Sequence, residues 1–523
     1  LRILKLFGNE AKHVTTTMGP EQEYFLVDEA LYQKRKDLKM CGRTLFGAKP
    51  VKGQEMDDQY FAAIKPRVIK YMEELNTELW KLGIYCKTEH NEAAPAQHEI
   101  GPIFTTSNLA ADQNQLTMEI MKKVARRHGL LCLLHEKPFE GVNGSGKHNN
   151  WSIATDKGEN LFSPGKTPME NAQFLLFLTA VIKAVDENQD LLRCIVASAG
   201  NDHRLGANEA PPSIMSIYVG DELDAILNAI RKGTDYEDAK KKKMTIGVDV
   251  LPPIPKDSTD RNRTSPFAFT GNRFEFRSVG SNLSISGPNT ILNAILADAL
   301  KSFADELEKS DNFDSDLHKL IKREITNHWN ILFNGNGYGA EWIVEAEKRG
   351  LKNYRTTPDA MEHYLDEKNI KLLGGLGIYT EDEMRSHYEI KLEKYCQTLN
   401  IEVETMIKMV NKDILCSSFK YMNVMADTSY KFQKILLSGF SGNELLADLN
   451  KLVRNLMQNT KNLEKLHVKT REMKDLLEKS KSYAYQILPA MEEVRAVADQ
   501  IELILGEEYK PFPSYEDLLY SVQ

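Results

Sequence analysis

The sequence lacks several features that would assign it quickly to a class of protein. Its six cysteines fall at wide, irregular spacings with no C-x-x-C pair, which argues against a structural zinc site and a disulfide framework. No apolar run approaches the roughly 18 residues of a membrane span, and no Walker G-x-x-x-x-G-K-[ST] loop is present. The net charge of −8 gives no indication of a basic surface for nucleic acid. We therefore expect a protein of the reducing cytoplasm, without a nucleic-acid or membrane partner.

The start of the chain, Leu-Arg-Ile-Leu-Lys-Leu, has no initiator Met and is too short and too charged for a signal peptide. This start is typical of a chain that begins partway through a helix, so we expect that a segment upstream is missing. The length of 523 residues predicts two to four domain-sized units. Hydrophobic residues at 41% and charged residues at 27% are ordinary for a soluble globular protein.

Local patterns predict strands separated by long helical and loop stretches. Apolar residues at helical spacing predict helices over residues 57–82 and 108–128. Short β-rich segments are predicted over residues 20–28, 84–104, 148–153, 213–219 and 272–279. Strands that return through long, irregular connections favour an α+β fold over a doubly wound sheet.

The last third of the chain has a different pattern. Steps of four and three residues predict a helical seam, with members Leu445, Leu449, Leu452, Leu456, Leu463, Leu466, Met473 and Leu477. Pro489 should break this run, and a second helix is expected from about residue 490 to Gly506. We interpret the pair as an antiparallel helical hairpin that packs on the body or on another subunit.

Two strand-like segments place charged side chains on one face. Residues 273–277, Arg-Phe-Glu-Phe-Arg, alternate so that Arg273, Glu275 and Arg277 share a face opposite the phenylalanines. For this pentapeptide taken alone, the alternative to a functional site is a ladder of structural ion pairs on the surface of a sheet. Glu21 and Glu23 also share a face, where two like charges destabilise a strand unless a cation neutralises them.

Two loops add further polar groups. Residues 92–99, Glu-Ala-Ala-Pro-Ala-Gln-His-Glu, carry a glutamate at each end around small residues, as expected where backbone approaches a ligand. Residues 143–148, Asn-Gly-Ser-Gly-Lys-His, form a turn whose N–H groups suit anions, followed by a histidine that suits a metal. Surface glutamates and an ordinary turn are the alternatives for each segment taken by itself.

Arginines occupy two further polar loops. Residues 204–211 begin with Arg204 and include Glu209, and residues 261–264 place Arg261 and Arg263 shortly before the Arg-Phe-Glu-Phe-Arg strand. Guanidinium groups bind carboxylates and phosphates in a bidentate manner. Solvated charged turns are the alternative interpretation.

In this order, the segments resemble the glutamine synthetase family. The matching pieces run from residue 19 to residue 277: 19–23 (Gly-Pro-Glu-Gln-Glu), 92–99, 143–148, 204–211, Arg263 and 273–277. Residues 200–212 and 509–519 are similar to the long type III branch. The resemblance implies the family's catalytic fold over residues 1–400, a curved antiparallel β-sheet flanked by helices. A helical region with a coiled-coil-like hairpin would follow over residues 401–523.

The resemblance also implies an activity and a set of site residues. The reaction would be ATP-dependent ligation of ammonia to L-glutamate, giving L-glutamine, ADP and phosphate through γ-glutamyl phosphate. Two or three Mg²⁺ or Mn²⁺ ions would be held by two sets of ligands: Glu23, Glu92 and Glu99, and Glu21, His148 and Glu275. Glutamate would be bound by Asn143, Gly144, Arg204 and Arg277. The nucleotide would contact Phe104, Ser152, Arg263 and Arg273, and the catalytic residues would be Glu209 and Arg263.

The sequence departs from the family pattern at three places. Asn150 stands where many relatives have a second histidine, and Ala268 stands where many have an arginine, with Arg261 as an alternative cation. The family's N-terminal domain supplies an aspartate to the neighbouring subunit's ammonium site, and we expect no residue of the given sequence to fill that role. The Asn-Leu-Tyr-Asp-Leu-Pro segment of the type I adenylylation loop is also absent.

Two other functions remain open from the sequence. A relative that joins glutamate to a larger amine would carry the same motifs. A non-catalytic structural or regulatory relative should have lost metal ligands, yet all six positions hold chelating side chains. The family forms stacked hexameric rings, so the resemblance implies a homo-oligomer, a dodecamer, with active sites between neighbours.

Overall fold

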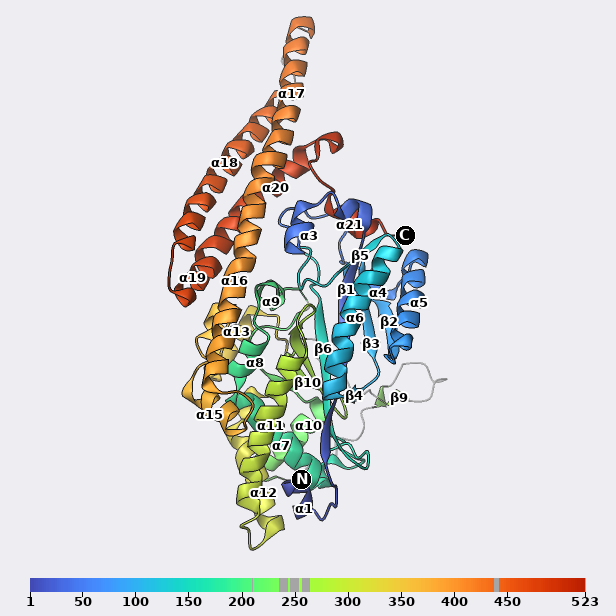
Figure 1. The fold of residues 1–523 in the computed structure, drawn as a ribbon, viewed down its shortest axis with the longest axis vertical. Helices are drawn as coiled ribbons and strands as arrows, with labels where there is room; N and C mark the ends of the chain where they lie inside the picture. The colour runs from blue at the N-terminus through green and yellow to red at the C-terminus, as the bar shows by residue number, and fades with distance from the viewer. Residues whose placement is uncertain (209, 235–242, 245–253, 256–263, 437–441, 523) are drawn as a thin grey trace.

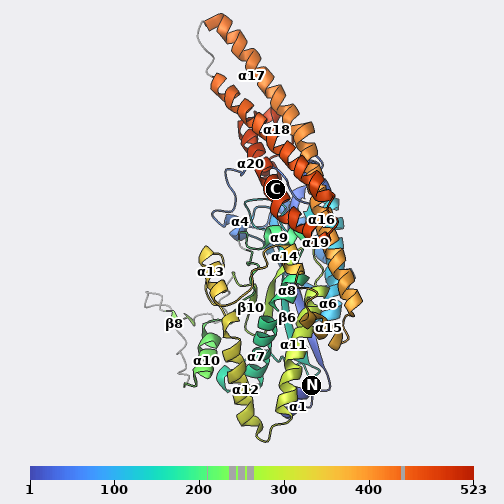
Figure 2. The ribbon, with the colours of Figure 1, turned by 90° about the vertical axis from the view of Figure 1, so that its left-hand side faces the viewer.

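The structure is a computed structural model that describes residues 1–208, 210–234, 243–244, 254–255, 264–436 and 442–522. The molecule is elongated, with a sheet-containing body and a bundle of long helices that runs along it and extends beyond one end (Figures 1 and 2). None of the helices in the described residues combines the length and the apolar composition that a membrane crossing requires. All six cysteines are free.

The body is built on a nine-stranded sheet. Its main path runs β2-β3-β1-β6-β11-β10-β7, and β4 and β5 also pair with β1. Every pairing in it is antiparallel except that of β10 with β7. The strands are β1 (Val14–Asp28), β2 (Cys86–Asn91), β3 (Gln97–Pro102), β4 (Thr105–Thr106), β5 (Leu130–Leu133), β6 (Gly146–Thr155), β7 (Ile217–Tyr218), β10 (Phe267–Phe269) and β11 (Phe274–Gly280). Separately, β8 (Lys243–Met244) pairs with β9 (Ile254–Pro255). The α+β prediction is confirmed.

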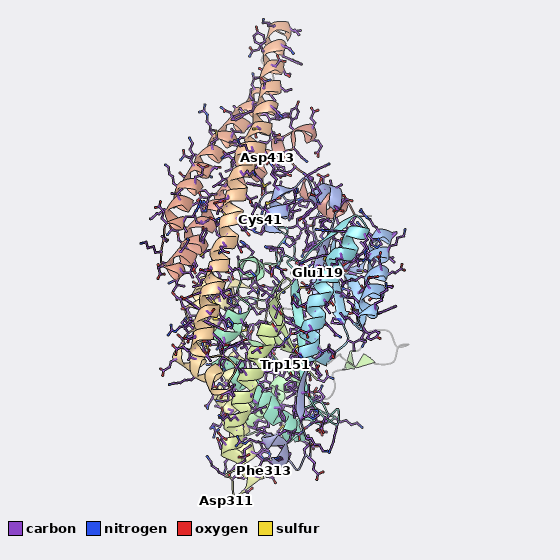
Figure 3. All side chains as sticks on the ribbon, in the orientation of Figure 1. Cys41, Glu119, Trp151, Asp311, Phe313 and Asp413 are labelled. Carbon is purple, nitrogen blue, oxygen red and sulfur yellow. The ribbon has the colours of Figure 1, made fainter. Side chains whose placement is uncertain are left out.

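Helices flank the sheet and enclose three apolar clusters in the body. The body helices are α1 (Arg2–Leu6), α2 (Glu29–Tyr32), α3 (Lys36–Cys41), α4 (Asp58–Phe61), α5 (Pro66–Lys81), α6 (Ser107–Arg127), α7 (Ala172–Glu187), α8 (Gln189–Ile195), α9 (Ala199–Arg204), α10 (Asp221–Lys232), α11 (Ser286–Leu307), α12 (Phe313–Asn327), α13 (Ala340–Lys348), α14 (Thr357–Met361) and α15 (Glu367–Gly375). Leu75 of α5 and Met121 of α6 pack with Tyr24 of β1. A larger cluster joins α7 and α11 to Trp151 of β6, which is labelled in Figure 3.

One predicted helix is confirmed and another is wrong in its first part. The helix expected over residues 108–128 is α6. The helix expected over residues 57–82 is divided into the short α4 and the long α5, which begins at Pro66. Proline has no backbone N–H and fits best in the first turn of a helix, so the chain restarts a helix there.

Five of the remaining helices form the long bundle: α16 (Glu381–Met409), α17 (Leu415–Leu436), α18 (Asn443–Arg471), α19 (Leu476–Ser482) and α20 (Leu488–Ile504). The last helix, α21 (Tyr515–Tyr520), packs on the body, where Tyr515 and Leu518 share an apolar cluster with Phe25. A π-helical turn, residues Val410–Ile414, joins α16 to α17. Asp413 of this turn (Figure 3) forms an ion pair with Lys36 of α3 at 2.7 Å, which ties the bundle to the body.

The predicted hairpin is present, but its break was placed wrongly. α18 packs against α20 and buries Leu449, Leu456 and Leu463, yet it ends at Arg471, before Met473. Pro489 does not end a helix, because α19 continues into α20 through a second π-helical turn, residues Tyr483–Ile487. The wider turn just before the proline accommodates its ring and its missing N–H.

The domain boundary predicted at residue 400 falls inside α16. Met384 and Leu392 of this helix pack in the core of the body, whereas Leu399 packs with the bundle helices. The two apolar cores therefore meet along one continuous helix, and the division at residue 400 stays a prediction.

Candidate active site

Strand register brings the predicted site residues onto one face of the sheet. Directly paired residues on neighbouring antiparallel strands point to the same side, as do residues two apart on one strand. Glu23 of β1 lies opposite Glu99 of β3, and Glu21 lies opposite His148 of β6. Two residues further along β6, Asn150 lies opposite Glu275 of β11. Four central strands thus present their polar side chains together.

A cavity of about 880 Å³, counting the space open to solvent, lies over this face. All six predicted metal ligands and all four predicted glutamate contacts line it: Glu21, Glu23, Glu92, Glu99, His148, Glu275, Asn143, Gly144, Arg204 and Arg277. Tyr60, His90, Gln97, Ala210 and Pro211 complete the lining. Segments that are far apart in the sequence therefore form one pocket.

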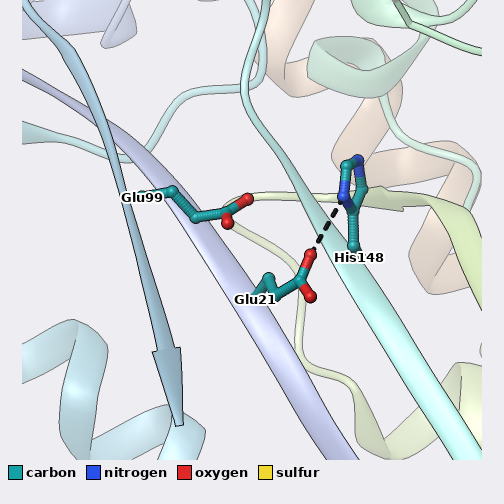
Figure 4. Close-up of side chains that lie close together, drawn as sticks. All are labelled: Glu21, Glu99 and His148. Carbon is teal, nitrogen blue, oxygen red and sulfur yellow. Dashed lines mark hydrogen bonds and ion pairs between the residues drawn. The ribbon is translucent and has the colours of Figure 1, made fainter. Parts of the chain in front are cut away.

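His148 is surrounded by carboxylates. Its Nδ1 lies 3.1 Å from Oε2 of Glu21 and 3.1 Å from Oε1 of Glu275, and its Nε2 lies 3.7 Å from Oε1 of Glu23. Figure 4 shows the imidazole facing Glu21, with Glu99 approaching from β3. Burial alone would lower the pKa of His148, but Glu21 and Glu275 raise it well above its usual value. The surroundings of His148 therefore strongly favour the positively charged form of its imidazole.

A second carboxylate cluster lies at the β2–β3 side. Nε2 of His90 lies 3.0 Å from Oε1 of Glu99, and its Nδ1 lies 3.6 Å from Oε1 of Glu92. Burial, followed by repulsion from Glu23 and Glu99, raises the pKa of Glu92 to about 8, and burial raises that of Glu99. The hydrogen bond with Glu99 raises the pKa of His90 to about 9. Negative charge is therefore costly here unless a cation compensates it.

The alternation predicted for residues 273–277 is present in β11. Phe274 and Phe276 are fully buried in the core, while Glu275 and Arg277 line the cavity. Nη2 of Arg277 donates to Oε2 of Glu275 at 3.1 Å. Burial alone would raise the pKa of Glu275, but Arg277 and His148 outweigh it and hold that pKa below its usual value. Glu275 is thus an ionised group at the centre of the site.

The glycine-rich turn makes room for Arg204. A Cβ on Gly146 would lie 2.1 Å from Nη2 of Arg204, and one on Gly144 would lie 2.4 Å from the carbonyl oxygen of Glu136. The N–H of Gly146 donates to Oε2 of Glu23 at 2.6 Å. Nε of Arg204 is buried without a hydrogen-bond partner among the described residues. The turn therefore seats a buried guanidinium against the cavity, where an anion would satisfy it.

The small residues between Glu92 and Glu99 also pack in the core of the body. Ala94 and Ala96 are buried against Phe25 and Phe139 in an apolar cluster. Their small side chains allow this segment to pack closely on the core. Core packing is one reason for their size, and the approach of a ligand to this segment stays a prediction.

The predicted nucleotide contacts continue along the sheet outside the cavity. Arg273 donates from Nε to Oδ1 of Asn150 at 2.9 Å, and Nδ2 of Asn150 donates to Oε1 of Glu21 at 2.9 Å. The guanidinium of Arg273 lies 5.4 Å from the centre of the Phe104 ring. Ser152 is buried and donates to the carbonyl oxygen of Asn272 at 3.2 Å. Asn150 therefore links the arginine to a carboxylate of the cavity.

Some site residues lie outside the described residues, and others were missed by sequence reasoning. Glu209, Arg261 and Arg263 belong to the first group. His90 and Tyr60 belong to the second. His90 stands two residues before Glu92 and directly opposite Glu99 in the β2–β3 hairpin, so the hairpin register would have revealed it.

The side chains of the cavity fit divalent cations. Ligand atoms of Glu21, Glu99 and His148 lie within 4.8 Å of one another, as do those of His90, Glu92 and Glu99. Carboxylate oxygens with an occasional imidazole suit Mg²⁺ or Mn²⁺ better than metals that prefer sulfur. Five carboxylates, when ionised, also exceed the two guanidiniums and two protonated imidazoles of the cavity, which leaves negative charge for cations to offset.

Comparison with known proteins gives consistent matches. The family model "Glutamine synthetase, catalytic domain" matches residues 3–215, and "Glutamine synthetase C-terminal domain" matches residues 316–433. A "Glutamine synthetase" of Butyrivibrio fibrisolvens is 47% identical over 100% of this chain and 75% of its own length. A "Type-3 glutamine synthetase" of Dictyostelium discoideum is 43% identical over 99% of this chain and 72% of its own. A "Glutamine synthetase" of Bacteroides fragilis (strain YCH46) is 42% identical over 99% and 73%.

Similarity to solved structures is weaker. One titled "Apo GmaS without ligand" aligns with 76% of this chain and 71% of its own, at 18% identity and a TM-score of 0.45, and supports no inference about function. The sequence matches extend over nearly the whole chain at more than two-fifths identity and include a type-3 relative. The resemblance found in the sequence is thus confirmed, and the chain belongs to the glutamine synthetase family.

Proposed function

We propose that the protein ligates ammonia to L-glutamate with ATP, giving L-glutamine, ADP and phosphate. The observation that carries this proposal is the cavity on the sheet, where five carboxylates and His148 lie beside the buried guanidiniums of Arg204 and Arg277. An acidic substrate and a polyphosphate both need cationic partners, and this arrangement provides guanidiniums and a cation-binding face side by side.

The reaction would proceed in two steps. An oxygen of the γ-carboxylate of glutamate attacks the γ-phosphorus of ATP, the bond to the leaving ADP oxygen breaks, and γ-glutamyl phosphate forms. The nitrogen of ammonia then attacks the acyl carbon, the carbon–oxygen bond to phosphate breaks, and glutamine and phosphate leave. The ammonium nitrogen must lose protons in the second step, and Glu209 is the proposed acceptor.

The residues of the cavity and the predicted nucleotide contacts outside it divide into proposed tasks. Asn143, Gly144, Arg204 and Arg277 would hold glutamate, and Arg273, Arg263, Phe104 and Ser152 would hold the nucleotide and its transferring phosphoryl group. Two or three Mg²⁺ or Mn²⁺ ions, held by Glu23, Glu92 and Glu99 and by Glu21, His148 and Glu275, would neutralise charge on the phosphates. The hydrogen-bond chain through Asn150 would keep Arg273 directed toward this charge.

We further propose a homo-oligomer of stacked hexameric rings, a dodecamer, that works in the cytoplasm. An exposed apolar patch at the β2 edge of the sheet supports subunit contact there. Trp80, Leu82, Tyr85 and Ile103 are each about half exposed, which is unusual for a group of large apolar side chains. The mass of the full-length protein in solution tests this, and a monomer that is fully active would contradict it.

The activity is tested with full-length protein, ATP, Mg²⁺ and glutamate, with either ammonium or a panel of larger amines. Phosphate release and glutamine formation that require ammonium support the proposal, and Glu275→Ala should abolish both. Glu89→Gln is the matched control, because Glu89 accepts a hydrogen bond from Asn76 of α5 at 2.6 Å and does not line the cavity. Release of phosphate only with a larger amine would refute the proposal.

A further inference from the structure

Loop 47–57, which precedes α4, is held by the last helices of the chain. Its backbone N–H groups donate to acidic side chains of α20 and α21, and one of its carbonyl groups accepts from a tyrosine. These contacts are Gly47 N to Asp499 Oδ1 at 2.8 Å, Ala48 N to Glu502 Oε2 at 2.9 Å, Val51 N to Glu516 Oε1 at 3.2 Å, and Tyr520 Oη to the Lys52 carbonyl oxygen at 2.7 Å. Side chains of α20 and α21 therefore determine where this loop lies.

Gln54 of this loop reaches the cavity wall. Its Nε2 donates to Oδ1 of Asn143 at 2.7 Å, and its Oε1 accepts from the backbone N–H of Asn143 at 2.8 Å. Two hydrogen bonds between the same pair of residues fix both the position and the rotation of the Asn143 amide. Since Oδ1 of Asn143 accepts from Gln54, the NH₂ group of Asn143 is the half of the amide turned away from the loop.

α21 also holds the segment that carries Asn143. The hydroxyl of Tyr515 accepts from the backbone N–H of Glu140 at 3.0 Å and from Nη2 of Arg495 at 2.8 Å. At the other end of the same helix, Tyr520 holds loop 47–57. One short helix thus aligns the two segments that meet at Gln54 and Asn143.

We propose that Gln54 is a positioning residue for the amino-acid substrate, and that α21 sets its position. It turns the NH₂ donors of Asn143 toward an acceptor group of the substrate, as a carboxylate requires. This inference rests on the proposed function, because it assumes that Asn143 contacts glutamate. It adds a residue outside the matching motifs, on a loop that the sequence did not single out.

The test compares Gln54→Glu, Gln54→Ala and Tyr520→Phe with unmodified full-length protein. A glutamate side chain still accepts from the Asn143 N–H but has no donor for Oδ1, so the Asn143 amide should rotate and present its oxygen to the cavity. We expect Gln54→Glu to raise the KM for glutamate about tenfold, which is about 1.4 kcal/mol. Gln54→Ala should give a smaller rise, and Tyr520→Phe the smallest.

The KM for ATP and the unfolding temperature separate positioning from general damage. Both should stay unchanged in Gln54→Glu, because the substituted group touches Asn143 and not the nucleotide side. Met56→Ala is the control on the same loop, since Met56 is 75% exposed, and its KM for glutamate should equal that of the unmodified protein.

Three results would overturn the inference. A KM for glutamate within twofold of the unmodified value in Gln54→Glu would exclude positioning while leaving the proposed function intact. Equal rises in the KM values for glutamate and ATP, together with a lower unfolding temperature, would assign Gln54 a structural role only. If the unmodified protein neither binds glutamate by calorimetry nor uses it, the proposed function and this inference both fail.

Discussion

Replacing Glu99 with Gln should remove much of the stabilisation that divalent cations give to this protein. Glu99 is buried on β3 and belongs to both groups of side chains whose ligand atoms lie within 4.8 Å of one another. Glutamine has nearly the same shape and keeps an oxygen for the contact with His90. The substitution therefore changes the charge of the cluster and little else.

The expected size of the repulsion between Glu99 and the neighbouring carboxylates follows from the separation of their charges. The ligand atoms of Glu99 and Glu21 lie within 4.8 Å of each other, and two unit charges at that limit interact by about 3.5 kcal/mol at an effective dielectric constant of about 20. Burial is the main reason that the pKa of Glu99 is raised, and repulsion from Glu21 and Glu23 adds to it. Without a cation the negative charge of Glu99 is thus a net cost, and the variant should unfold no more easily than the unmodified protein.

When a divalent cation is bound, the order of stability reverses, and the unmodified protein should be more stable than Glu99→Gln. A ligand present at about 100 times its Kd stabilises a folded protein by about 2.7 kcal/mol, and a 100-fold weaker site gains only about 0.4 kcal/mol at the same concentration. We expect loss of one carboxylate to weaken binding by about this factor, since changes in groups that only support ligands cost about 10- to 100-fold. The difference between the two proteins should then be about 2 kcal/mol.

Urea unfolding in EDTA measures the stability without a cation, and urea unfolding in excess MgCl₂ or MnCl₂ measures the stabilisation that the cation adds. Glu89→Gln, at a half-buried glutamate of β2 outside the cavity, is the control and should keep the full cation response. Equal stabilisation of Glu99→Gln and the unmodified protein by the cation would refute the assignment of the carboxylate face to metal binding. Loss of stability in EDTA alone would refute the reasoning about repulsion.

Three further substitutions probe the glycine-rich turn, a buried ion pair and a distant histidine. Gly146→Ala places a Cβ 2.1 Å from Nη2 of Arg204, so the guanidinium must shift, and the KM for glutamate should rise at least about tenfold. Arg43→Met leaves the Glu402 carboxylate buried without its 2.8 Å partner, which should cost about 3–5 kcal/mol of unfolding free energy in urea. Burial alone would lower the pKa of His328, but two acidic hydrogen-bond partners raise it to about 9; its contribution to stability is complete below pH 6.5 and lost as the pH rises through 9. His328→Gln should therefore lower the unfolding temperature at about pH 6 and leave it unchanged at about pH 10.

Two of these substitutions have a matched comparison variant, and two have a result that would contradict the reasoning. Gly375→Ala should leave kinetics unchanged, because nothing lies within 4 Å of a Cβ there. The double variant Arg43→Met with Glu402→Leu should recover most of the lost stability, since it removes the uncompensated charge. A pH-independent effect of His328→Gln would exclude the ion-pair explanation, and an unchanged KM in Gly146→Ala would exclude a role for Arg204 in binding glutamate.

The faces of individual strands could be predicted from the sequence alone. Two-residue alternation put Glu275 and Arg277 on one side of β11 and Phe274 and Phe276 on the other, and the structure has this arrangement. The same rule placed Glu21 and Glu23 together, and both line the cavity. Local geometry was sufficient in these cases because a strand determines the direction of its own side chains.

Contacts between strands could not be predicted in this way. The pair of Glu21 with His148 joins residues 127 positions apart, and it depends on the register of β1 with β6. No local pattern fixes that register, because it follows from how the whole sheet packs. His90 and Gln54 were missed for the same reason, since each becomes part of the site only through a partner on another segment.

Pro66 and Pro489 show where the usual effect of proline on a helix holds and where it does not. Pro66 begins α5, as its missing N–H requires. Pro489 stands inside a continuous helical run, because the π-helical turn Tyr483–Ile487 changes the hydrogen bonding just before it. Ile487 is buried in the bundle core, where packing compensates for an irregular backbone that residue propensities do not reveal.

Transfer of an oxygen isotope tests most directly that the site phosphorylates a carboxylate on the way to an amide. Glutamate labelled with ¹⁸O in its γ-carboxylate is supplied with ATP, Mg²⁺ and ammonium, and the released phosphate is analysed by mass spectrometry. Attack of the γ-carboxylate on ATP followed by displacement with ammonia predicts one ¹⁸O atom in each phosphate, together with one glutamine. Phosphate that carries no ¹⁸O, or that forms without glutamine, would contradict carboxylate activation at this site.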